Sequence, residues 1–128
     1  MIGLFMVSLS GFIAKGLMDM VSDTAPEIPA IAIGGGPGGE LGCDLERIVG
    51  ALEDIISPES TIVLFDSMIS YLAVRQAIAD LRCNGVRNIT TVPAAFIEGA
   101  LTAAREISKG IPIEDVIEVL EKLKLDKA

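Results

Sequence analysis

The sequence predicts an α/β domain in three layers, with a four-stranded, mostly parallel sheet and helices on both of its faces. Short apolar runs of strand length alternate with longer segments that have helical spacing. The first of these runs is apolar almost throughout, which is typical of a strand buried on both faces. Of the 128 residues 51% are apolar and the mean hydropathy is +0.57, so we expect residues 1–128 to form a single domain around one core.

The first half of the chain predicts two strands and two helices. Ile2–Ser8 is an apolar run bounded by a turn and is read as a strand, and Phe12–Val21 has apolar residues at helical spacing. Ala30–Ile33 follows two prolines and is the second expected strand. After a glycine-rich loop, Cys43–Ile56 carries one apolar helical face, and Ser57-Pro58 is expected to end that helix.

The second half repeats the alternation and ends in two consecutive helices. The turn at Asn84-Gly85 separates a helix from the fourth strand, and Pro112 opens the last helix. A short extra edge strand near Val92–Phe96 also fits the pattern. The expected elements are a strand at Thr61–Phe65, a helix at Met68–Leu81, a strand at Ile89–Val92, and helices at Ala94–Ser108 and Ile113–Leu123.

Composition narrows the class of protein. The net charge of -8 and the pI near 4.4 argue against nucleic acid and anionic membrane as partners. Cys43 and Cys83 are far apart and are read as free thiols in a reducing compartment. The uncharged run Met1–Ala14 has no basic residue before it and is too short to span a bilayer as a helix. We therefore expect a cytoplasmic protein.

The glycine-rich loop at residues 34–42 is the most informative motif, because it holds six of the thirteen glycines. Ligands of parallel sheets bind at the carboxyl ends of the strands, so four segments are expected to converge there. These are Ser8–Gly11, the loop, Asp66-Ser67 and the stretch after Val92. The candidate pocket residues are Ser8, Leu9, Ser10, Gly34, Gly35, Gly36, Gly39, Glu40, Gly42, Asp66 and Ser67.

Several common sites are disfavoured. Gly34, Gly36 and Gly39 satisfy G-x-G-x-x-G, but the match follows the second strand, contains Pro37 and includes no G-K-[ST], so a nucleotide cofactor is not expected. The chain contains no histidine, which excludes a Ser-His-Asp nucleophile, and its carboxylates show no metal-ligand spacing. Asp66 could be a receiver phospho-acceptor, but that chemistry needs an acidic pair after the first strand. We expect neither a metal nor a cofactor.

A purely structural reading also remains open. Ser8 and Ser10 fit a strand end and a helix N-cap better than they fit nucleophiles. The glycine loop could be no more than a tight connection, and Asp66 could cap the helix that follows it.

The whole chain nevertheless resembles a known family through five features. They are Ala32-Ile33-Gly34-Gly35, Gly39-Glu40-Leu41-Gly42, the Leu45–Leu52 helix, Asp66 after the third strand, and Glu98-Gly99. These resemble the mannose-type EIIA family, and within it the phosphotransferase subunits of PTS-dependent dihydroxyacetone kinases. The resemblance implies a four-stranded parallel sheet and a homodimer. It also implies HPr and the dihydroxyacetone kinase subunits as partners.

Members of that family take a phosphoryl group from HPr onto a histidine after the first strand and pass it to ADP on a kinase subunit. The family pattern Val-Ser-His-Ser reads Val7-Ser8-Leu9-Ser10 here, and leucine has no lone pair that could attack phosphorus. Met68 and Ile69 replace a family glycine and serine, Ala95 replaces a proline and Cys43 a threonine.

These departures predict that Asp66 is retained but that no catalytic set is intact. The protein would then act as a docking or regulatory partner of the kinase subunits or of HPr. The alternative is a metabolite-binding protein that reuses the pocket for an uncharged or partly apolar ligand, with loop amides as hydrogen-bond donors.

Overall fold

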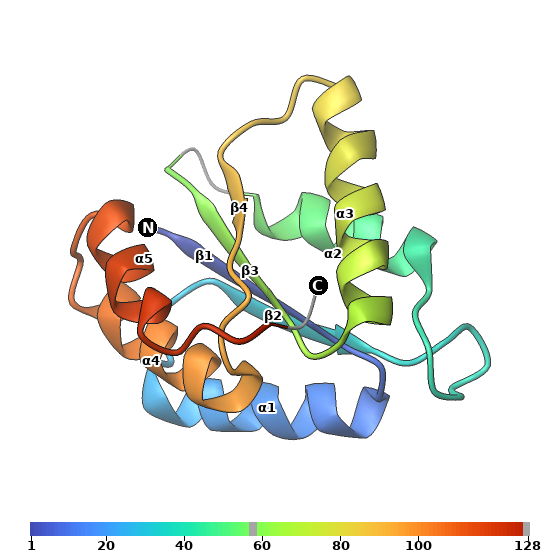
Figure 1. The fold of residues 1–128 in the computed structure, drawn as a ribbon, viewed down its shortest axis with the longest axis horizontal. Coiled ribbons are helices and arrows are strands. Elements are labelled where there is room, and N and C mark those ends of the chain that lie inside the picture. Colours follow the sequence, from blue (N-terminus) through green and yellow to red (C-terminus); the bar gives the residue numbers. More distant parts are fainter. Residues whose placement is uncertain (57–58, 127–128) are drawn as a thin grey trace.

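The computed structural model describes residues 1–56 and 59–126, and the described chain folds around one four-stranded sheet (Figure 1). The strand order is β2-β1-β3-β4, and all three neighbouring pairs are parallel. This confirms the predicted fold class. The strands are β1 at Gly3–Ser8, β2 at Ala30–Gly34, β3 at Thr61–Phe65 and β4 at Ile89–Thr91.

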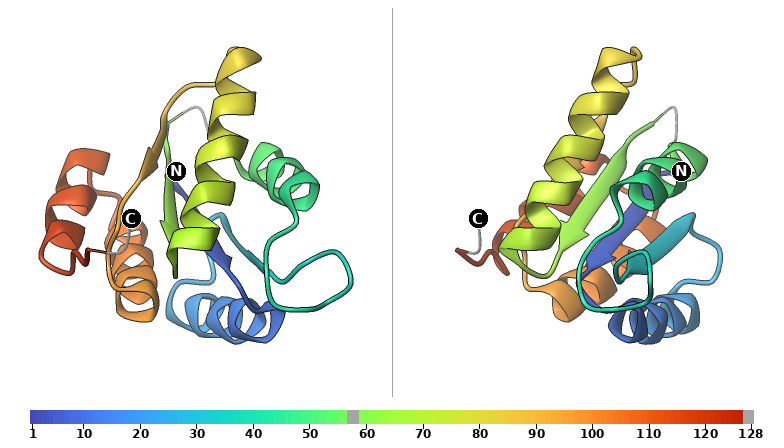
Figure 2. Two further views of the ribbon diagram at one scale, coloured as in Figure 1. Left: turned by 45° about the vertical axis from the view of Figure 1, so that its right-hand side comes forward. Right: turned by 90° about the vertical axis from the view of Figure 1, so that its right-hand side faces the viewer.

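Helices cover both faces of the sheet. Figure 2 shows α1 and α4 on one face, with α5 outside α4, and α2 and α3 on the other face. The short connections between parallel strands and helices place every strand's carboxyl end at one edge of the molecule. The helices are α1 at Gly11–Thr24, α2 at Leu45–Ile55, α3 at Met68–Cys83, α4 at Phe96–Ser108 and α5 at Ile113–Glu121.

The central strand explains the continuous apolar run at the start of the chain. All six residues of β1 are buried. Leu4 and Met6 pack into the cluster formed with α1, α4 and α5, whereas Phe5 and Val7 pack into the cluster formed with α2 and α3. Because successive side chains of a strand point to opposite faces, a strand covered on both sides must be apolar at every position.

Several predicted boundaries move by one to three residues because of the caps. The first helix starts at Gly11 and runs to Thr24, after the N-cap Ser10. The second starts at Leu45, after the N-cap Asp44. The third runs on to Cys83 and the last ends at Glu121, while the predicted helix end at Ser57-Pro58 lies outside the described residues.

The region between β4 and α4 differs from the prediction. The fourth strand ends at Thr91, although the Val92 N–H still donates to Val63 O at 3.0 Å. In place of an extra strand near residues 92–96, an isolated antiparallel bridge joins Ala94 to Lys124. Pro93 has no N–H to extend a ladder, and α4 begins at Phe96 rather than at Ala94.

Candidate functional site

The carboxyl ends of β1 and β3 are tied together by one carboxylate. Asp66 follows β3, and its Oδ2 accepts hydrogen bonds from Ser8 Oγ at 2.7 Å and from the Leu9 N–H at 3.2 Å. Ser8 is fully buried, while Leu9 and Asp66 are half-buried. The predicted meeting of Ser8, Leu9 and Asp66 therefore occurs, and Leu9 takes part in it through its backbone N–H.

The second oxygen of Asp66 is held by a serine that sequence reasoning missed. Ser70 is fully buried and donates its Oγ to Asp66 Oδ1 at 2.8 Å. Ser67 is the N-cap of α3 and forms a capping box with Ser70. Asp66 therefore does not cap the helix itself. The spacing Ser67-x-x-Ser70 is the signal that could have revealed this, because a capping box joins residues at that interval.

The two serines beside Leu9 have the structural roles expected of them. Ser10 is the N-cap of α1 and accepts from the Ile13 N–H at 3.3 Å. Ser8 ends β1, and its Oγ accepts from the Ser10 N–H at 3.0 Å while it donates to Asp66. Both hydroxyl groups therefore form hydrogen bonds that stabilise the turn from β1 into α1.

The glycine loop packs against this same turn. A Cβ at Gly34 would lie 2.9 Å from Ser8 O and closer still to Ser10 O, so only glycine allows this approach. Gly35 and Gly39 have φ of +86° and +87°, which also favours glycine. The loop closes on the site through the Gly42 N–H, which donates to Leu9 O at 2.9 Å.

Within the loop, amide donors and a carboxylate are already paired with each other. Gly36 N–H donates to Glu40 O at 2.7 Å, and Gly39 N–H donates to Gly36 O at 3.0 Å. The Glu40 carboxylate folds back and accepts from the Gly38 N–H at 3.0 Å. These amides are engaged by the chain itself, and the carboxylate adds a negative charge where the sequence suggested donors for an anion.

Cys43 joins the site on the α2 side. Burial, and then the negative charge of Asp66, raise the pKa of the Cys43 thiol. A raised pKa keeps the sulfur in its neutral thiol form near neutral pH, so it is a poor nucleophile there. The arrangement as a whole contains serines, the carboxylates of Asp66 and Glu40 and the Cys43 thiol, and it offers no ring nitrogen to accept a phosphoryl group.

The stretch after Val92, the fourth segment expected at the site, makes backbone hydrogen bonds elsewhere. The Ala95 N–H donates to Leu123 O at 2.8 Å, and the Leu125 N–H donates to Pro93 O at 2.7 Å. The stretch after Val92 thus pairs with the end of the described chain. Glu98 lies exposed on the first turn of α4, and Gly99 is buried against Ala94.

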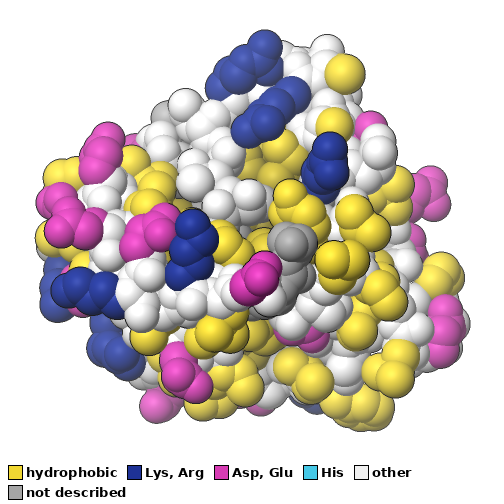
Figure 3. All heavy atoms as spheres, in the orientation of Figure 1, with side chains coloured by type: hydrophobic (Ala, Val, Ile, Leu, Met, Phe, Trp, Pro, Cys, Tyr) yellow, Lys and Arg dark blue, Asp and Glu magenta, His cyan; other side chains and the backbone are white. Residues whose placement is uncertain are grey.

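Large apolar side chains surround the site and point into solvent. We call this set the apolar rim, and it belongs to the starts of α1, α2 and α3 and to the glycine loop. Figure 3 shows hydrophobic side chains gathered over the start of α3 and along α1. Phe12 is 90% and Leu41 77% exposed, and they line a shared cavity of about 500 Å³. The rim consists of Phe12, Ile13, Leu41, Leu45, Met68, Ile69 and Leu72.

Two features that would indicate other functions are absent from the described residues. No group of three or more metal-binding side chains gathers within residues 1–56 and 59–126. None of the helices described there is both long and apolar enough to cross a membrane.

Comparison with known proteins gives three consistent results. Residues 3–117 match the EIIA-man family, described as the PTS system fructose IIA component. The chain is 31% identical over 127 residues to the PTS-dependent dihydroxyacetone kinase phosphotransferase subunit DhaM of Lactococcus lactis subsp. lactis, covering 98% of each chain. A crystal structure of the unknown-function protein EF1359 superposes with a TM-score of 0.85 at 20% identity, covering 98% of this chain and 96% of that one, and it shows the fold alone.

The family match covers most of the chain, and the similarity to DhaM extends over nearly all of it. The four-stranded parallel sheet is the one that the resemblance implies. The chain belongs to the EIIA-man family of the phosphotransferase system.

Proposed function

We propose that this protein is a single-domain, cytoplasmic subunit of the dihydroxyacetone kinase group that carries no phosphoryl group and acts by docking to a kinase subunit or to HPr. The observation that carries the proposal is Leu9. It occupies the position that the family resemblance gives to the phospho-acceptor, in a sequence without histidine. A leucine side chain cannot form the phosphoryl bond that the transfer requires.

The contacts around Leu9 support a protein that has lost phosphoryl transfer but kept the family fold. Asp66 accepts from Ser8 and the Leu9 N–H through Oδ2, which ties the end of β3 to that of β1, and from Ser70 through Oδ1, which ties it to the start of α3. An aspartate used in this way stabilises the local fold, since hydrogen bonds to a charged acceptor contribute about 1.5–3 kcal/mol each. Asp66 therefore has a structural reason to persist without a phosphohistidine to orient.

The apolar rim supports the docking role. Extended exposed apolar surface marks protein-binding sites on otherwise polar proteins. Met68 and Ile69, 55% and 59% exposed, stand where the family resemblance places a glycine and a serine. The replacements thus enlarge the apolar surface at the place where a family member presents its reactive group to a partner. We also propose, from the family resemblance, that the protein is a homodimer.

Calorimetric titration of the protein with a purified nucleotide-binding subunit of dihydroxyacetone kinase, and separately with HPr, tests the docking role. We expect one of the two to bind and Ile69→Glu to weaken that affinity at least tenfold, because a buried unpaired carboxylate opposes docking. Met20→Glu is the matched control, since Met20 is also exposed but lies near the far end of α1. Absence of binding to both partners, or equal weakening by the two variants, would contradict the proposal.

The metabolite-binding alternative is favoured by one observation, the cavity shared by Phe12 and Leu41. Lys15 and Ser10 also line it, so it would suit a partly apolar ligand with one anionic group. A thermal-shift screen of phosphorylated metabolites separates the two roles, because a ligand at one hundred times its Kd adds about 2.7 kcal/mol of stability. A shift that Phe12→Ala abolishes, without binding to a kinase subunit or to HPr, would establish the alternative.

A further inference from the structure

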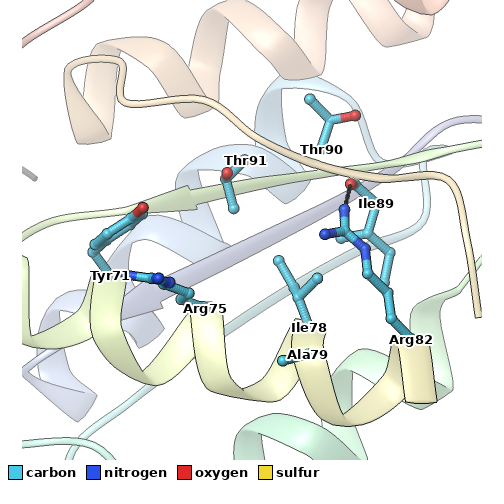
Figure 4. A pocket seen from close by; sticks show the side chains of 8 residues that line it. All are labelled: Tyr71, Arg75, Ile78, Ala79, Arg82, Ile89, Thr90 and Thr91. Carbon is cyan, nitrogen blue, oxygen red and sulfur yellow. Dashed lines mark hydrogen bonds between the residues drawn. The ribbon is translucent and has the colours of Figure 1, made fainter. Parts of the chain in front are cut away.

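The two edges of the sheet differ in what engages them. At the β4 edge the Arg82 guanidinium donates to Ile89 O at 3.3 Å (Figure 4). The antiparallel bridge between Ala94 and Lys124 follows that strand. At the β2 edge, no other described segment pairs with the strand. All residues of β2 are half-buried, whereas β1 and β3 are buried throughout, so β2 is the accessible edge.

The outward-facing backbone groups of β2 belong to alternate residues. The Leu4 N–H donates to Pro29 O at 2.9 Å, and the register pairs Leu4 with Ala30. In a parallel ladder, residues whose backbone groups face the neighbouring strand alternate with residues whose groups face away. The N–H and C=O groups of Ala30 and Ala32, and the N–H of Gly34, therefore face the open side.

A cavity of about 310 Å³ lies over the carboxyl half of this edge. Its lining includes Ala32, Ile33 and Gly34 from β2, Lys15 from α1 and Arg47 from α2. Figure 2 shows β2 between α1 and α2, which cover opposite faces of the sheet. Because both helices contribute to the lining, the cavity lies over the edge of the strand and not over one face of the sheet.

This edge cavity carries a positive charge on an acidic protein. Lys15 and Arg47 are both exposed, and neither forms an ion pair with another described residue. Asp19 also lines the cavity and offsets one of the two cations, which leaves one net positive charge in a chain whose net charge is -8. With the outward N–H of Gly34 as a further donor, the cavity suits a single carboxylate.

An apolar cavity adjoins the edge cavity. The cavity of about 500 Å³ that Phe12 and Leu41 line also has Gly11 and Lys15 in its lining, and the edge cavity has the same two residues. The two cavities therefore meet beside the start of α1. A large apolar side chain placed against Phe12 and Leu41 would remove their apolar surface from water. A carboxylate and an apolar group could thus bind next to each other.

We propose that the β2 edge binds the C-terminal end of a partner chain as an added parallel strand. The backbone of the added strand would pair with Ala30 and Ala32, as peptides do at the exposed edges of other sheets. Its terminal carboxylate would lie between Lys15 and Arg47, and its last apolar side chain would enter the apolar cavity. This site goes beyond the proposed docking role, because the strand edge lies outside the apolar rim.

Direction and charge both favour a C-terminal end. All neighbouring strands of the sheet are parallel, and a parallel added strand places its last residue at the carboxyl end of β2, where the two cavities lie. An antiparallel strand would bring its first residue there, and Lys15 and Arg47 would repel a terminal ammonium group. The terminal carboxylate is the charged group that the backbone of a parallel strand itself carries to that point.

The test uses the peptide acetyl-Thr-Val-Thr-Val-Leu with a free carboxyl end as the probe and amide NMR spectra of the labelled protein as the readout. We expect saturable shifts at the Ala30 and Ala32 amides. Amidation of the peptide's end, or the double variant Lys15→Glu, Arg47→Glu, should weaken binding about tenfold or more. Arg105→Glu is the matched control and should bind as the parent does, because Arg105 is an exposed arginine on α4 that lines neither cavity.

Three outcomes would overturn the proposal. One is equal binding of the free and the amidated peptide. Another is an absence of saturable shifts at the Ala30 and Ala32 amides, including the case in which octanoate binds as tightly as the peptide and shifts only the residues around Phe12. The last is a dependence of the Ala30 and Ala32 shifts on protein concentration without peptide, which would assign the edge to a second copy of this chain. Since no kinase subunit or HPr is present, these results are independent of the proposed docking role.

Discussion

Replacing Gly34 by alanine tests how tightly the glycine loop is built against the end of β1. The added Cβ would lie 2.9 Å from Ser8 O, 2.8 Å from the carbonyl carbon of Ser10 and closer still to Ser10 O. Both residues are fixed by other bonds, Ser8 to Asp66 and Ser10 to the Ile13 N–H. The clash therefore falls on backbone that cannot move without breaking these contacts.

Overpacking of this kind costs about 1–3 kcal/mol, and we expect Gly34→Ala to lie near the upper limit because both opposing groups are backbone. Gly50→Ala is the matched control. Gly50 is in the interior of α2, and its added Cβ would meet nothing within 4 Å. That change should stabilise the protein by about 0.5–1 kcal/mol, because alanine loses less conformational freedom than glycine on folding.

Urea unfolding followed by circular dichroism measures both changes. A loss of about 3 kcal/mol moves the unfolding midpoint down by roughly 1–3 M of urea, since m is about 1–3 kcal/mol/M for small proteins. Gly50→Ala should move it slightly up. If the free energy of unfolding of Gly34→Ala lies within about 0.5 kcal/mol of the parent's, the effect is no larger than that of a neutral surface change. The described packing of the loop against β1 would then be wrong.

Two further predictions concern the chemistry of the site. Leu9→His should be phosphorylated slowly by HPr, and adding Met68→Gly and Ile69→Ser should raise the rate about 10²–10³-fold, the usual effect of one charge-stabilising donor. Intact mass followed against time measures the rate. Full family-like rates from Leu9→His alone would show that the substitutions at positions 68 and 69 are neutral. Because the pKa of the Cys43 thiol is raised by burial and by Asp66, its alkylation by iodoacetamide at pH 7.5 should be slower than that of free cysteine, and it should accelerate as the pH rises through that pKa and in Asp66→Asn. Peptide mass mapping measures this, and a Cys43 that reacts faster than free cysteine would refute it.

Much of the fold could be predicted from the sequence because its signals are local. The run at Ile2–Ser8 indicates burial on both faces, and the alternation of strands and helices then gives a parallel sheet. Element ends were predicted less well, because they depend on which side chain caps a helix. Asp44, for example, delays the start of α2 to Leu45.

The site could be predicted only in part, for a physical reason. Parallel strands bring Ser8 and Asp66 to the same edge of the sheet, so their meeting follows from topology. The bonding of Ser70 to Asp66 and the folding back of Glu40 onto its own loop depend on side-chain geometry that spacing does not encode. The apolar rim likewise appears only when three helix starts and the loop are assembled in space.

The proposed function depends on this chain being unable to carry the phosphoryl group that its family transfers. The direct measurement is incubation of the protein with phosphoenolpyruvate, enzyme I and HPr, followed by intact-mass spectrometry. We expect no phosphorylated protein, because position 9 is a leucine and the sequence has no histidine. Stoichiometric phosphorylation, with Asp66 the first acceptor to examine, would contradict it.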